Sequence, residues 1–132
     1  MEPSTRVTFP RWVFLVAGIY GLIVLLPQYF LESEIGTEQP PAITHPEYFY
    51  GFVGLAVVWQ IVFLCIARNP VRYRLLMISA ILEKLAFAIP TLILLVQGRI
   101  SGPVPIFGFI DFVLGGFFLA AYVRTPRGDA VR

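Results

Sequence analysis

Four long apolar segments take up most of this 132-residue chain, and they constrain its fold more than any other feature. They run approximately over residues 12–31, 48–67, 75–97 and 104–123. A helix needs about 20 apolar residues to cross the roughly 30 Å of hydrocarbon in a bilayer, and each segment has that length. Only 14% of the residues are charged, against about 25% in an ordinary soluble domain. The sequence therefore predicts an all-α integral membrane protein with one transmembrane domain over residues 1–132.

The connections between these segments are short, which predicts an antiparallel four-helix bundle. Basic residues lie almost entirely on one side of the predicted membrane, since Arg99 alone lies on the other side. This bias is typical of the positive-inside rule and predicts a multi-pass inner-membrane protein with both termini cytoplasmic. The same arginines serve as head-group anchors, and no folded basic surface remains for nucleic acid. The eight residues on the cytoplasmic side are Arg6, Arg11, Arg68, Arg72, Arg74, Arg124, Arg127 and Arg132.

Three ionisable residues interrupt the apolar segments. Glu83 and Lys84 are adjacent in the middle of the third segment, and Asp111 lies inside the fourth. A charged side chain at the bilayer centre costs about 2.5–3.5 kcal/mol on insertion scales. Such residues usually pair inside a bundle or face a functional cavity. These three side chains are therefore the main candidates for a functional site.

Counting residues at 1.5 Å of helix rise per residue gives the depth of each polar group. Asp111 is thirteen residues before Arg124, about 20 Å from the cytoplasmic end of its segment. Lys84 lies at an intermediate depth and has a flexible stem, so we expect an ion pair between Lys84 and Asp111. The fourth segment also carries Gly108 and Gly115 on the same helical face as Asp111, which predicts that this face points into the bundle.

The second segment brings two further candidates to the depth of Glu83. Gln60 is eight residues from Arg68, about 12 Å from the cytoplasmic side, and Glu83 is about 13 Å from that side. We therefore expect Glu83 to lie near Gln60 or near the ring of Trp59. Glu83, Lys84, Asp111, Gln60 and Trp59 together form the predicted ligand-binding or proton-handling group, and no catalytic role is assigned to any of them.

The three ionisable residues provide two carboxyls and one ammonium. If Lys84 neutralises one carboxylate, the other acid has no partner. Burial favours the neutral form of an unpaired carboxyl, which could relay protons, act as a general acid or receive a cationic ligand group. One hypothesis is a pocket that binds or acts on a small lipid-like molecule. The alternative is a structural or accessory subunit, in a homo-oligomer or with a membrane partner, whose charges serve helix packing. Proton-coupled transport is a third, less favoured hypothesis, because four helices would have to dimerise.

The outer end of the second segment holds a weaker candidate. His45 and Glu47 follow an acidic loop, expected to be extended over residues 32–41, and one histidine with carboxylates could bind a divalent metal. The spacing does not define a ligand set, so no metal site is assigned. Thr44 and Glu47 also have the spacing of a capping box, which predicts a helix start here. No motif for a nucleotide or another cofactor is present, and a single cysteine, Cys65, excludes an internal disulfide.

Four motifs carry a resemblance to known proteins: residues 45–52 (HPEYFYGF), Trp59-Gln60, residues 68–73 (RNPVRY) and residues 82–84 (LEK). They resemble the signature of a family of small, uncharacterised bacterial four-helix membrane proteins, and this resemblance covers nearly the whole chain. It implies the fold but no activity. The layout, with Trp59-Gln60 beside an acid, is more loosely similar to the EXPERA group of sterol isomerases and sigma-2-type receptors. That likeness implies a small bundle with buried acids.

Overall fold

The computed structural model describes residues 3–128 and is helical throughout its ordered elements. Four helices are long and apolar enough to cross a membrane, which confirms the predicted class of protein. No strand is present within residues 3–128. The elements are α1 (Pro3–Leu25), a 3₁₀ helix η1 (Leu26–Phe30), α2 (Glu32–Glu38), α3 (Pro46–Arg68), α4 (Leu76–Val96) and α5 (Val104–Arg124).

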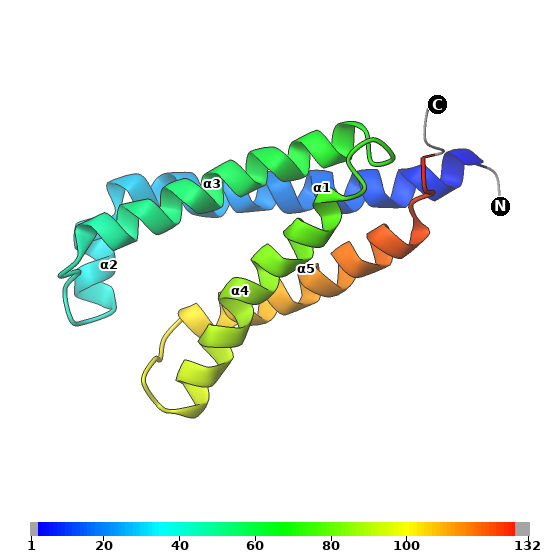
Figure 1. Ribbon diagram of the computed structural model, residues 1–132. Helices are drawn as coiled ribbons and strands as arrows, with labels where there is room; N and C mark the ends of the chain where they lie inside the picture. Colours follow the sequence, from blue (N-terminus) through cyan, green and yellow to red (C-terminus); the bar gives the residue numbers. More distant parts are fainter. Residues whose placement is uncertain (1–2, 129–132) are drawn as a thin grey trace.

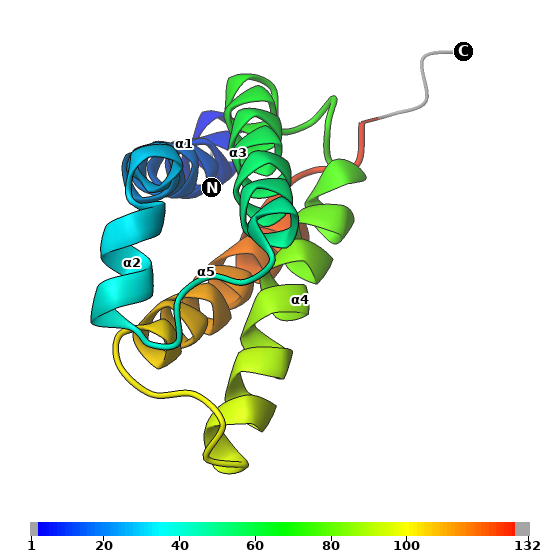
Figure 2. The same ribbon diagram turned by 90° about the vertical axis from the view of Figure 1, so that its left-hand side faces the viewer.

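The four long helices form two pairs. Helix α1 packs along α3, and α4 packs along α5 (Figure 1). The pairs meet at the end of the molecule where α1 begins and α5 ends, and they diverge toward the opposite end. Helix α2 lies at that open end, between the α1/α3 pair and the start of α5 (Figure 2). The space between the pairs is therefore closed at one end and spanned by a short helix at the other.

An aromatic cluster joins the two pairs where they meet. The ring of Phe14 on α1 stacks on that of Phe118 on α5, with centroids 4.3 Å apart. Phe63 on α3 meets Phe118 edge-on, with centroids 4.9 Å apart. All three side chains are fully buried, and Met77 of α4 completes the same cluster. Stacked and edge-on rings stabilise such contacts beyond their buried area, so this cluster fixes the point from which the pairs diverge.

The outward faces of the helices are apolar. Ile23, Leu55 and Phe109 on three different helices are each about 70% exposed. Soluble monomers rarely expose apolar patches larger than a few hundred Å². A continuous apolar exterior on four such helices fits a surface that is solvated by lipid.

One expectation for the outer end was wrong. Residues 32–41 were expected to be extended, but residues 32–38 form α2. The helix begins with a bond from the Ile35 amide to the Leu31 carbonyl, and the hydroxyl of Tyr50 donates to Glu32 Oε2 at 2.6 Å. The first helix also begins nine residues before residue 12 and changes to 3₁₀ at Leu26. Pro27 has no amide hydrogen to donate to the preceding turn, which explains this change.

Candidate functional site

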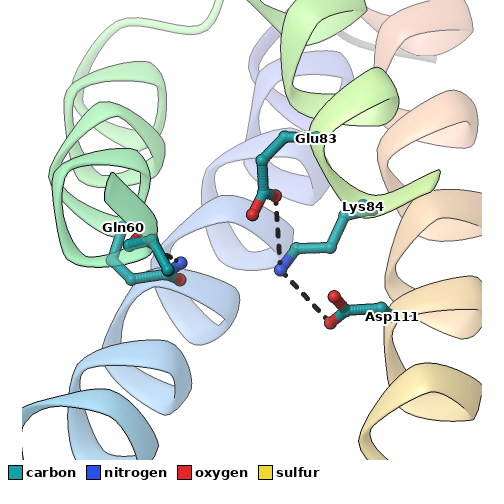
Figure 3. A network of polar contacts seen from close by, with 5 residues as sticks. Gln60, Glu83, Lys84 and Asp111 are labelled. Atoms are coloured by element: carbon teal, nitrogen blue, oxygen red, sulfur yellow. Dashed lines mark hydrogen bonds and ion pairs between the residues drawn. The ribbon is translucent and has the colours of Figure 1, made fainter. Parts of the chain in front are cut away.

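Lys84 lies between two carboxylates. Its Nζ is 3.3 Å from Asp111 Oδ1 on α5 and 3.4 Å from Glu83 Oε2 on its own helix (Figure 3). The predicted ion pair between Lys84 and Asp111 is thus confirmed. Lys84 is only 5% exposed, and both carboxylates are largely buried as well. The three side chains tie α4 to α5 at mid-helix.

The neighbours of Lys84 explain how an ammonium group is accommodated there. Gly115 of α5 faces its stem, since a Cβ built on this glycine would lie 3.6 Å from the Cβ of Lys84. The Nζ is 5.2 Å from the ring centroid of Phe63 on α3, within the range of a cation–π contact. Gly108 and Gly115 are both buried, so the predicted inward face of the fourth helix is confirmed.

The predicted count of two acids to one ammonium is unchanged, but neither acid lacks a cationic neighbour. Lys84 contacts both carboxylates, and when all three groups are ionised the trio keeps a net charge of −1. The contact with Glu83 is a weaker one, because Glu83 Oε2 is buried and accepts no well-aligned hydrogen bond from the described residues. A buried acceptor without a hydrogen bond is costly unless another group satisfies it.

Gln60 presents a second acceptor of this kind. It is 2% exposed, and its Nε2 donates to the Ala56 carbonyl of its own helix at 2.9 Å. Because only the NH₂ group can donate to a carbonyl, this bond fixes the orientation of the amide. Its Oε1 accepts no hydrogen bond from any residue within 3–128. Figure 3 shows the amide directed from α3 toward the side of Lys84 and Asp111.

Gly21 of α1 makes room for this amide. A Cβ at position 21 would overlap Gln60 Oε1 and would lie 2.8 Å from Gln60 Cγ. The absence of a side chain at Gly21 is therefore what lets Gln60 fold back against α1. Sequence reasoning did not single out this contact, because a glycine inside a predicted span does not reveal its partner.

A cavity of about 450 Å³ lies between the two helix pairs and brings these groups together. Four of the five predicted site residues border it, namely Gln60, Glu83, Lys84 and Asp111. Its remaining wall is mainly apolar and includes Val24, Leu25, Phe49, Phe52, Phe87 and Phe107. Sequence reasoning missed Tyr20 on α1 and the contribution of α2, which adds Ile35. The sequence carries no signal for either residue, because their positions on the cavity wall depend on how the two helix pairs diverge.

Trp59, the fifth predicted residue, borders a different space. It lines a groove of about 320 Å³ between α3 and α4 together with Glu83. The expectation that Glu83 lies near Trp59 is consistent with this shared groove. Glu83, Ala56, Phe52 and Phe87 border both spaces, so Glu83 lies at the boundary between the groove and the cavity.

His45 and Glu47 lie at the outer end and away from this site. His45 Nδ1 is 3.2 Å from Glu47 Oε1, and both side chains are exposed. No group of three His, Cys, Asp or Glu residues that could hold a metal ion occurs in the described part of the chain. The predicted capping box is wrong, because His45 is the N-cap of α3 and no side chain caps the helix.

The site thus combines an apolar cavity with a small group of buried polar side chains, an arrangement typical of small-molecule pockets. Its polar end offers mostly acceptors, on Gln60, Glu83 and Asp111. No protein-family model, no curated protein and no solved structure matches this chain.

Proposed function

We propose that this chain is a multi-pass inner-membrane protein that binds a small lipid-like molecule between its two helix pairs. The observation that carries the proposal is the cavity of about 450 Å³ with Gln60, Glu83, Lys84 and Asp111 on its wall. This volume lies within the range of about 300–1,000 Å³ that small-molecule pockets occupy. An apolar wall suits a hydrocarbon chain or ring system, and the buried polar groups suit its head group.

The proposed orientation places the meeting point of the pairs near the cytoplasm. It rests on the arginines of the sequence, eight of which belong to the termini and to the connection between α3 and α4. In this arrangement the four helices cross the bilayer in alternating directions as an antiparallel bundle, with both termini cytoplasmic. The cavity then opens toward the outer leaflet, where α2 lies across its mouth. A ligand would reach the site from the lipid phase or from the outer surface.

Filling the cavity tests the proposal. Ala56 borders the cavity and is mostly buried, so Ala56→Phe should occupy part of the ligand volume. Val58→Phe, which adds a ring to an exposed position of the same helix, is the matched control. Wild type and Val58→Phe, extracted in a mild detergent, should retain a bound small molecule in native mass spectra. Ala56→Phe should lose it while keeping its helical circular dichroism.

A second filling variant, Val24→Phe, guards against misfolding of the first, because Val24 borders the same cavity from α1. Retention of the same bound species in both folded variants would reject a ligand site between the pairs. Absence of any bound species from wild type, with and without added lipid extract, would reject it as well.

A structural role is the second candidate, and the position of Lys84 favours it. One ammonium within 3.4 Å of two carboxylates holds α4 and α5 together without any ligand. In that case Glu83→Gln and Asp111→Asn should lower the yield of folded protein or its assembly with a partner subunit. Normal folding of both variants, with altered ligand retention only, would reject a purely structural role.

A further inference from the structure

We infer that the head group bound in this cavity is a protonated amine, held between Gln60 Oε1 on one helix pair and the carboxylates of Glu83 and Asp111 on the other. The inference rests on the proposed function and adds the chemical class of the ligand. It follows from the charge, the donors and the acceptors at the polar end of the cavity.

The charge of the site selects a cation. When both carboxyls around the one ammonium are ionised, the trio carries a net charge of −1 among apolar side chains. An uncompensated charge in a low-dielectric site is strongly unfavourable, whereas a second cation makes the group neutral. An anionic head group would raise the net charge to −2. It would also compete with Glu83 and Asp111 for Lys84.

The hydrogen-bonding groups at the polar end of the cavity favour a head group that donates hydrogen bonds. Gln60 Oε1 is buried and accepts no hydrogen bond from the described residues, and buried Glu83 Oε2 has only its 3.4 Å ion pair with Lys84. One of the two N–H groups on Gln60 Nε2 donates to the Ala56 carbonyl, whereas Gln60 Oε1 remains an acceptor without a partner among the described residues. The Lys84 ammonium lies between two carboxylates and over the Phe63 ring. Tyr20, Gln28 and Gln39 also border the cavity, and each brings both a donor and an acceptor, so the carboxylates keep acceptors in excess.

The two sets of acceptors belong to different helix pairs. Gln60 is on α3, whereas Glu83 and Asp111 are on α4 and α5, and Figure 3 shows Gln60 across from the other side chains. A primary ammonium has three N–H groups and can donate to both sides at once. Binding would therefore bridge the pairs through one nitrogen, with the hydrocarbon part along the apolar wall toward α2.

Four probes with the same twelve-carbon chain test the class of ligand: dodecylamine, dodecyltrimethylammonium, dodecanol and dodecanoate. Occupancy is measured by native mass spectrometry of the protein in phosphatidylcholine nanodiscs, with Ala56→Phe defining non-specific uptake. Wild type should hold dodecylamine roughly tenfold or more above the alcohol and the carboxylate, since hydrogen bonds to charged groups are worth about a factor of ten or more. The trimethylammonium probe lacks N–H donors and should bind less than the amine.

Variants assign the preference to individual groups. Glu83→Gln and Gln60→Leu should each lower dodecylamine occupancy about tenfold. Glu47→Gln, which removes an exposed carboxylate at the start of α3, should leave it unchanged. Because Glu83 also contacts Lys84, Gln60→Leu provides a test that leaves the charged trio intact.

The outcomes separate the two proposals. Cavity-dependent binding of the alcohol or the carboxylate as strong as that of the amine would overturn the amine inference and leave a lipid-binding function standing. Equal binding of the trimethylammonium probe, or no effect of Gln60→Leu, would overturn the donor role assigned to the ligand. If no probe distinguishes wild type from Ala56→Phe, the proposed function itself fails.

Discussion

Lys84 links α4 to α5 through Asp111, with 3.3 Å between its Nζ and Asp111 Oδ1, while the same nitrogen lies 3.4 Å from Glu83 Oε2. One buried ammonium group thus lies within ion-pair distance of two largely buried carboxylates. The stability of this arrangement depends on all three groups together, because removal of one partner leaves the others without compensation.

Removal of Lys84 alone should therefore be more harmful than removal of the whole charged group. Lys84→Met leaves two carboxylates close together and should destabilise the protein by about 3–5 kcal/mol. The triple variant Glu83→Gln, Lys84→Met, Asp111→Asn should recover most of this loss. Unfolding of the purified proteins in detergent, followed by circular dichroism, measures both. A triple variant no more stable than Lys84→Met would show that the charges do not act as a unit.

The contact of Gly108 with Thr91 predicts a steric effect between α4 and α5. A Cβ at Gly108 would lie 2.6 Å from Thr91 Cγ2 and 3.0 Å from Thr91 Cβ, which is close to the backbone and cannot turn away. Gly108→Ala should cost about 1–3 kcal/mol through overpacking. Gly116→Ala, at another position of α5 where a Cβ would meet no atom within 4 Å, is the control and should be neutral or slightly stabilising.

Thr91→Ser removes the closest methyl group and should restore part of the stability lost in Gly108→Ala. Thermal unfolding of the four proteins forms a double-mutant cycle for this contact. Additive effects of the two substitutions would contradict direct packing of Gly108 on Thr91.

The hydrogen bond from the Tyr50 hydroxyl to Glu32 Oε2, at 2.6 Å, predicts how α2 is held across the cavity mouth. Tyr50→Phe removes the donor and should speed amide exchange of residues 32–38 roughly five- to tenfold, which corresponds to about 1–1.4 kcal/mol. Tyr48→Phe is the control, because Tyr48 is 72% exposed. Hydrogen–deuterium exchange in nanodiscs provides the measurement, and unchanged exchange in Tyr50→Phe would show that this bond does not hold α2.

The charge distribution predicts a labelling pattern in cells. In a Cys65→Ser background, which removes the single cysteine, Glu34→Cys and Ser101→Cys should react with a membrane-impermeant maleimide in intact spheroplasts. Arg127→Cys should react only after permeabilisation. The opposite pattern would invert the proposed orientation, and equal labelling at all three sites would indicate insertion in both directions.

Local properties of the sequence were enough to predict the four long helices and one contact between two of them. The length and apolarity of each segment predicted four spanning helices, because both properties are fixed by neighbouring residues. The constant rise of a helix also placed Lys84 and Asp111 at comparable depths, and their opposite charges then predicted the ion pair.

Other contacts between distant segments could not be predicted in this way. The acidic, proline-containing stretch after residue 31 suggested an extended loop, yet residues 32–38 form α2, and Tyr50 lies 18 residues from its partner Glu32. Gln60 of α3 likewise packs against Gly21 of α1. Neither contact leaves a periodic signal in the chain.

The sequence by itself determined four helices that are long and apolar enough to span a membrane, with three ionisable groups inside them, since chain length, hydropathy and helix rise are local quantities. Only the tertiary structure decided that the helices separate into two pairs joined at an aromatic cluster, and that a cavity opens between them. The packing of Gln60 against Gly21 was also decided by the tertiary structure. These features depend on how side chains from α1, α3, α4 and α5 fill space together, and no single helix encodes that packing.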